Sequence, residues 1–126
     1  MTPRRIYLAS PYSGDVLSNT DYARACMADS LARGEAPFAP HLLYTQVLDD
    51  NQPEQRRLGR DAGAAFLCAC DALVVYVDRG VSAGMRAEMS IAHDHDIVVE
   101  LRLLDETSPA RPGGAASLVT PRASTR

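Results

Sequence analysis

The sequence has no tryptophan, two phenylalanines and only three cysteines among its 126 residues. Cys26, Cys68 and Cys70 are odd in number and lack the spacing of a zinc site, which excludes the disulfide framework of a small secreted protein. No apolar run approaches the roughly 18 residues that a membrane span needs, and no signal region precedes the first strand-like stretch. We therefore expect a cytoplasmic protein that is not embedded in a membrane.

An excess of positive charge is also missing. The formal net charge is −3, which is unsuited to binding the backbone of DNA or RNA and favours a small-molecule partner. The length and the 46% hydrophobic content suffice for one ordinary core. We expect one domain over residues 1–105 and a flexible tail over residues 106–126, where Ser, Thr, Pro, Ala and Gly replace patterned apolar residues.

Short apolar runs alternate with helical patterns along the first hundred residues. Strands are predicted at 5–10, 36–40, 72–77 and 97–101, and helices at 18–33, 54–70 and 83–95. Ser18 is the expected start of the first helix, Gly34 its stop and Ser82 the cap of the third. The short, proline-bounded run 36–40 favours a sheet edge. The order predicts an α/β fold, a flavodoxin- or Rossmann-like three-layer sandwich with a mainly parallel sheet of four to five strands, which binds ligands at the carboxyl ends of its strands.

Glu88 is an anomaly within the third predicted helix. At about 100° per residue its face is otherwise apolar or small, and carries Val81, Gly84, Met85, Ile91 and Ala92. An ionised carboxylate there costs several kcal/mol unless it is paired, and it lies beyond the first turn, where the helix dipole could stabilise it. The position favours a functional carboxylate. The alternative is a glutamate at the helix rim that reaches solvent or pairs with an arginine.

The turn before this helix could bind an anion. Residues 78–84 join a buried strand to a helix start, where free backbone N–H groups and the Ser82 hydroxyl face one way. The alternative is that Ser82 is an ordinary helix cap that binds nothing.

Two motifs carry a resemblance to a known family. The first is the strand and loop Ile6–Gly14, and the second is the strand Cys70–Val77 followed by Ser82–Ala92. Together they resemble the nucleoside 2-deoxyribosyltransferase superfamily, over residues 5–101. Transferases of that superfamily that act on free nucleosides tend to carry Asp six residues before the nucleophilic Glu, and the glycosidases of nucleoside 5'-monophosphates tend to carry Ser. Ser82 places this chain nearest to the glycosidase branch.

The resemblance implies a role for each matching residue. Glu88 would attack C1' of the sugar, Tyr7 would orient Glu88, and a covalent glycosyl intermediate would follow. The residues implied or expected to bind the substrate are Ser10, Tyr12, Ser13, Gly14, Asp78, Ser82, Gly84 and Arg60. Tyr12 could stack on the base or merely fill space. The reaction needs no cofactor and no metal, and the family usually forms homodimers, so we expect a homodimer or higher homo-oligomer.

The chain departs from the family at one important position. Gly63 stands where an Asp is usual, which leaves the acid for the departing base unassigned. His41, just after the second strand, is our first candidate, and Asp61 is the second. The helix face through Gly63 also carries Arg56 and Arg60, which could admit an anion or be a solvated arginine-rich turn.

The resulting hypothesis is hydrolysis of the N-glycosidic bond of a ribo- or deoxyribonucleoside 5'-monophosphate. The alternatives are a deoxyribosyltransferase that exchanges bases, and a nucleotide-binding module without catalysis, which the missing Asp could indicate. The sequence leaves the base, the sugar and the pathway open.

Overall fold

The computed structural model describes residues 2–104, and the predicted tail over residues 106–126 lies outside the described residues. The chain forms β1 (Arg5–Ala9), α1 (Val16–Ala32), β2 (Ala36–Phe38), α2 (Pro53–Ala69), β3 (Ala72–Tyr76), α3 (Ala83–Asp94) and β4 (Val98–Arg102). Two short 3₁₀ helices, η1 (Pro40–Leu42) and η2 (Tyr44–Gln46), lie between β2 and α2. The predicted alternation of strands and helices is confirmed. Within residues 2–104, no helix has the length and apolar character to cross a membrane.

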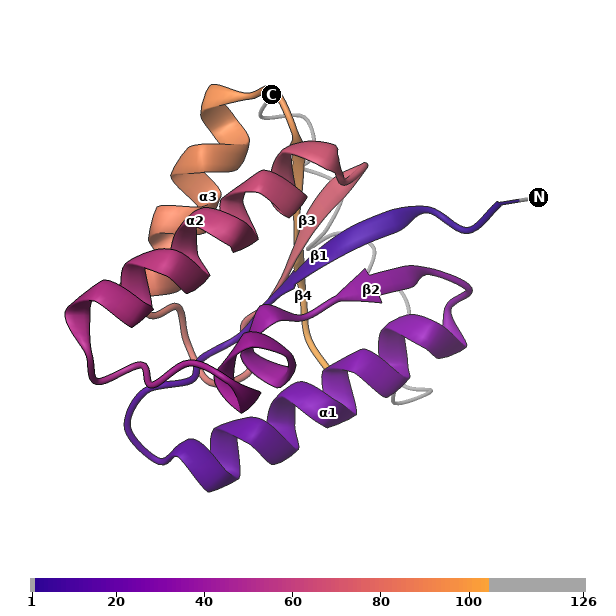
Figure 1. Cartoon of the computed structure of the whole chain (residues 1–126). Helices are drawn as coiled ribbons and strands as arrows, with labels where there is room; N and C mark the ends of the chain where they lie inside the picture. Colours follow the sequence, from indigo (N-terminus) through magenta and orange to yellow (C-terminus); the bar gives the residue numbers. More distant parts are fainter. Residues whose placement is uncertain (1, 105–126) are drawn as a thin grey trace.

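The strands form one sheet in the order β2-β1-β3-β4, and every neighbouring pair is parallel. The short strand expected at an edge is an edge strand. The β-branched strand β3 is central, and all five of its residues are buried. Figure 1 shows α1 on one face of the sheet and α2 with α3 on the other. This is the predicted three-layer sandwich.

Successive side chains of a strand point to opposite faces of the sheet, so the sheet divides the core into two halves. The residues of β1 and β3 that share the α1 side with Tyr22 and Cys26 are Ile6, Leu8, Ala72, Val74 and Tyr76. Those that share the other side with Leu67, Met85 and Ala92 are Tyr7, Ala9, Leu73 and Val75. A fully buried Leu or Val side chain stabilises the fold by about 1.5–3 kcal/mol. Because its neighbours in β1 face α1, Tyr7 points toward α2 and α3.

Capping residues and glycine turns determine where the helices begin and end. Ser82 caps α3 as predicted, because its hydroxyl oxygen accepts the N–H of Met85 at 3.2 Å. The expected start of α1 at Ser18 is wrong. Gly14, with φ of +98°, turns the chain so that Asp15 takes the cap position, and its carboxylate accepts the Ser18 N–H at 3.2 Å. Gly34 ends the helix as expected, with φ of +86°.

The α1 side of the sheet also holds a set of paired charges, Arg4, Glu35, Glu100 and Arg102, which we call the charged quartet. Arg102 donates to both oxygens of Glu35 at 2.9 and 3.0 Å, and Arg4 donates to Glu35 at 2.8 Å and to Glu100 at 2.6 Å. Burial alone would raise the pKa of Glu35, but hydrogen bonds from Arg102, Arg4 and Ser30 outweigh it and lower the pKa to about 2.

Candidate active site

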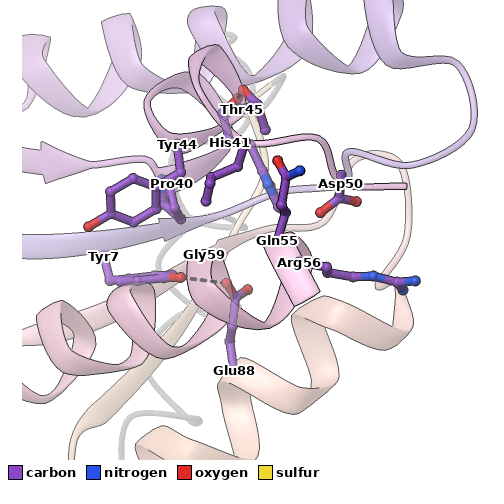
Figure 2. A pocket seen from close by; sticks show the side chains of 11 residues that line it. Tyr7, Pro40, His41, Tyr44, Thr45, Asp50, Gln55, Arg56, Gly59 and Glu88 are labelled. Atoms are coloured by element: carbon purple, nitrogen blue, oxygen red, sulfur yellow. Dashed lines mark hydrogen bonds between the residues drawn. The ribbon is translucent and has the colours of Figure 1, made fainter. Parts of the chain in front are cut away.

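The carboxyl ends of β1, β2 and β3 open onto two connected cavities. The main cavity has a volume of about 480 Å³ and lies between the first loop, α2 and the N-terminal half of α3. A side chamber of about 70 Å³ adjoins it on the side of η1, η2 and the start of α2. The residues that line both are Tyr7, His41, Asp50, Arg56 and Glu88. The two cavities therefore meet at Glu88, and Figure 2 shows the residues around the side chamber.

Tyr7 and Glu88 form the central contact of the site. The Tyr7 hydroxyl donates to Oε2 of Glu88 at 2.6 Å, the dashed line in Figure 2. Tyr7 is 3% exposed. The second carboxyl oxygen, Oε1, is buried and has no hydrogen-bond partner among residues 2–104. A buried carboxyl oxygen without a partner is costly, and such an atom in a binding cavity calls for an explanation.

Burial sets the proton affinity of this pair. Burial raises the pKa of Glu88 to about 7, and the hydrogen bond from Tyr7 acts in the opposite direction. Burial and the neighbouring Glu88 raise the pKa of Tyr7, so its hydroxyl keeps its proton and remains a donor. Near neutral pH, Glu88 is thus present in both the ionised and the protonated form. Such a pKa is typical of a functional carboxyl group.

Local packing explains why this contact forms. The Ser82 cap fixes the register of α3, and Glu88, six residues later, lies opposite Tyr7 of β1. On the α2 side, Gly63 is buried, and a Cβ at this position would lie 3.0 Å from the Tyr7 hydroxyl oxygen. Gly63 therefore allows α2 to pack directly against the hydroxyl group. A side chain at position 63 would crowd Tyr7, which explains the glycine at this position.

His41 and Tyr12 close one side of the site. Their rings stack with centroids 4.9 Å apart and an interplanar angle of 20°. Burial lowers the pKa of His41, and the charge of Asp50 acts in the opposite direction. Asp61, the carboxylate expected nearest to the site, is exposed and lines neither cavity. Asp50 takes that place. The sequence analysis missed it because it stands in a polar run that indicated only a loop before α2.

The start of α3 offers an anion-binding face to the main cavity. Ser82 and Gly84 line it together with Ser13 and with Arg60 of α2. Backbone N–H groups at a helix start carry a partial positive charge, and the guanidinium group of Arg60 adds a full charge. These four residues, expected from the sequence to bind substrate, are brought together around one cavity.

Three other expected substrate-binding residues lie outside both cavities. Ser10 is buried at the end of β1 with 2% exposure, and Gly14 forms the turn before α1. Asp78 turns away because its carboxylate accepts the Tyr22 hydroxyl at 2.5 Å and the Leu104 N–H at 2.8 Å. It ties the turn after β3 to α1. Among the described residues, no group of three or more His, Cys, Asp or Glu side chains could hold a metal ion.

A known family covers the part of the chain that contains these residues. A family described as a domain of unknown function, DUF7768, matches residues 4–102. The chain belongs to this family. The DUF7768 domain runs from just before β1 to the end of β4 and contains every residue of the two cavities.

Solved structures share the fold of this DUF7768 domain. A 2-deoxyribosyltransferase from Bacillus psychrosaccharolyticus has a TM-score of 0.58 and 20% identity, over 79% of this chain and 72% of the transferase. A conserved protein from Enterococcus faecalis V583 has a TM-score of 0.56 and 19% identity, over 79% of this chain and 62% of its own. No curated protein matches the sequence. At such identities the likeness shows the fold.

Proposed function

We propose that this domain hydrolyses the N-glycosidic bond of a ribo- or deoxyribonucleoside 5'-monophosphate, with Glu88 as the nucleophile. One observation carries the proposal. Where the two cavities meet, Tyr7 holds one oxygen of Glu88 by a 2.6 Å hydrogen bond, while the other oxygen, Oε1, has no partner among the described residues. A fixed carboxylate with one free oxygen suits attack on a sugar carbon.

The reaction proceeds in two steps. Oε1 of ionised Glu88 bonds to C1' while the bond from C1' to the base nitrogen breaks and its electron pair leaves with the base, which takes up a proton. Water then attacks C1' and gives a proton to the group that protonated the base, which releases the sugar 5-phosphate and returns Glu88 as a carboxylate. Two displacements at one carbon give net retention of configuration. Tyr7 assists the first step because its hydrogen bond stabilises the ionised form of Glu88.

The main cavity suits the phosphate end of the substrate. Its volume of about 480 Å³ lies in the range of small-molecule sites. Ser82, Gly84 and Arg60 form its anion-binding face, and they support a phosphorylated substrate over a free nucleoside. The Ser82 position is also the one that, by resemblance, separates monophosphate glycosidases from transferases.

His41 is the proposed donor of the proton that the leaving base takes up. It lines both cavities and stacks on Tyr12, which fixes the plane of its ring. Gly63 cannot take this role, because it carries no side chain. A homodimer or higher homo-oligomer, expected from the resemblance, belongs to the same proposal and is checked by light scattering.

Transfer of the sugar to a second base is the other candidate function. It is favoured by the likeness of fold to a protein described as a 2-deoxyribosyltransferase. The same nucleophile and the same intermediate serve both reactions. They differ in what releases the sugar from Glu88, which is water in hydrolysis and an acceptor base in transfer.

The deciding experiment measures free base released from a panel of ribo- and deoxyribonucleoside 5'-monophosphates, with and without acceptor bases. We expect the wild-type protein to release base without an acceptor. Glu88→Ala is expected to lose at least about 10³-fold in rate, and the exposed control Glu54→Ala to keep full activity. Turnover only with an acceptor base would establish transfer. Binding without any base release would leave a nucleotide-binding module.

A further inference from the structure

The side chamber has polar groups that the proposed reaction does not use. Thr45 and Gln55 line the side chamber and not the main cavity, and Asp50 lines both. Figure 2 shows Thr45 and Gln55 on the side of the chamber opposite Glu88, with Asp50 next to them. These three side chains do not belong to the proposed catalytic or phosphate-binding groups. Their hydrogen-bonding capacity therefore requires a separate explanation.

The existing hydrogen bonds determine what each group can still offer. Oε1 of Gln55 accepts the Asp49 N–H at 2.7 Å, which leaves the amide NH₂ as a donor. The Thr45 hydroxyl donates to the His41 carbonyl at 2.7 Å, which leaves its oxygen as an acceptor. Among the described residues, the Asp50 carboxylate makes neither a hydrogen bond nor an ion pair. An ionised carboxylate only accepts, so a ligand that satisfies Asp50 has to carry N–H or O–H donors.

The lining residues of the two cavities follow an order in space. Ser82, Gly84 and Arg60 line only the main cavity, and Thr45 and Gln55 line only the side chamber. Glu88 and Asp50 line both cavities. A nucleoside monophosphate has the same order, from phosphate through C1' to base. With C1' at Glu88 and the phosphate at the start of α3, the base extends into the side chamber.

We propose that the side chamber is the base subsite and that Asp50 selects nucleobases with an exocyclic amino group. The proposal rests on the proposed function for the position of C1'. Guanine is the best complement, because its N1–H and 2-amino groups can both donate to one carboxylate while its O6 accepts from the Gln55 amide. Hypoxanthine lacks the 2-amino group, and uracil has a carbonyl group where cytosine has an amino group.

Two matched pairs of substrates test this proposal directly. Guanosine and inosine 5'-monophosphates differ by one amino group, and the cytidine and uridine compounds differ by an amino group in place of a carbonyl. We expect kcat/KM to favour the amino member of each pair by about 10- to 100-fold. In Asp50→Asn, which adds a donor, the preference is expected to fall to near unity. Asp61→Asn, on the exposed side of α2, is the control that keeps it.

Binding measured separately distinguishes this proposal from the proposed function. Calorimetry on Glu88→Gln, which cannot complete the reaction, reports binding of the same four nucleotides. If Asp50-dependent selection appears in binding while the wild-type protein releases no base, the base subsite stands and the hydrolase proposal fails. If base is released without preference within either pair, the base subsite is overturned and the hydrolase proposal stands. Absence of both binding and turnover overturns both.

If Asp50 acted only through the pKa of His41, the rates of the four nucleotides would change in a different way. Asp50 raises the pKa of its neighbour His41, so its loss could slow every substrate by removing a proton donor. Asp50→Asn would then lower kcat for all four nucleotides equally and leave both preferences intact. That result would overturn selection of the base by Asp50. Thermal melting of each variant confirms that the fold is retained.

Discussion

The two faces of the sheet bury carboxyl groups under opposite conditions. On the α1 side, Glu35 of the charged quartet is hydrogen-bonded by Arg102 and Arg4, and its pKa falls to about 2. On the other side, Glu88 has Tyr7 as its one hydrogen-bond partner among residues 2–104, and its pKa rises to about 7. Both groups are partly buried, and burial raises the pKa of each, so burial alone does not explain the difference. Nearby guanidinium groups stabilise the ionised form of Glu35, whereas within the described part of the chain no guanidinium group is hydrogen-bonded to Glu88.

The difference separates a structural role from a chemical one. A buried charge with complete partners has little left to offer a ligand, and removing one partner is costly. A buried carboxyl group with a free oxygen destabilises the fold but can react. On this basis we propose that the quartet serves stability and that Glu88 serves function.

Arg102→Ala should cause the largest loss of stability. Arg102 is 4% exposed, and its removal leaves Glu35 and Glu100 with fewer partners inside the protein. We expect the free energy of unfolding in urea to fall by about 3–5 kcal/mol. Arg5→Ala, which removes an exposed ion pair with Asp71, is the control and should cause only a small change. Equal losses in the two variants would contradict a structural role for the quartet.

Glu88→Gln should remove part of the pH dependence of stability. The folded protein holds a proton on Glu88 up to about pH 7, whereas the unfolded chain releases it near its ordinary pKa of 4.5. Wild-type stability therefore decreases as pH rises from 4.5 to 7, by at most about 3 kcal/mol from this group. The variant lacks this decrease. Urea unfolding of both proteins across this pH range measures the difference. If the free energies of unfolding of the two proteins changed with pH in parallel, folding would not raise the pKa of Glu88.

Gly63→Ala should impair activity more than stability. The new methyl carbon would lie 3.0 Å from the Tyr7 hydroxyl oxygen and displace it from Glu88. We expect kcat/KM for base release to fall by about 10- to 100-fold. The higher helix propensity of alanine, by up to about 1 kcal/mol, offsets the crowding. Asp61→Ala, on the exposed side of the same helix, is the control and should keep its activity.

Tyr7→Phe should shift the pH profile of the reaction. Attack needs ionised Glu88 and proton donation needs protonated His41, so kcat/KM of the wild-type protein should follow a bell-shaped pH profile to which Glu88 contributes a pKa of about 7. The Tyr7 hydrogen bond lowers the pKa of Glu88, so its loss should shift the Glu88 titration to higher pH and reduce the rate near pH 7 by about 10-fold. A profile that keeps its midpoint would assign the titration to another group.

The sequence predicted most of the fold because its signals are local. The apolar, β-branched run of β3 and the proline-bounded β2 predicted a central and an edge strand. Ser82 predicted the start of α3, and through it the face on which Glu88 lies. The start of α1 was wrong because two residues suited to capping, Asp15 and Ser18, stand three positions apart, and only the turn at Gly14 decides between them.

The site was less predictable because it depends on contacts between distant segments. Asp78 was expected at the cavity, but Tyr22 of α1 binds its carboxylate. Asp50 lies at the site because the chain forms two 3₁₀ helices between β2 and α2, and no periodic pattern in the sequence indicates these helices. The reason for a glycine at position 63 is a hydroxyl group in β1, more than fifty residues away in the sequence. Such pairings become visible only once the strands are assembled.

The thioether of Met85 makes a weak hydrogen bond to the proposed anion-binding face. Its sulfur accepts the backbone N–H of Ser82 at 3.3 Å, and the side chain is almost fully buried. Sulfur is a weak acceptor, so this bond satisfies the N–H group without holding it strongly. An arriving anionic oxygen can take over the N–H group at little cost, and the loop keeps its shape between one ligand and the next. In the proposed phosphate site, Met85 would therefore hold this N–H group in position until a ligand oxygen replaces the sulfur.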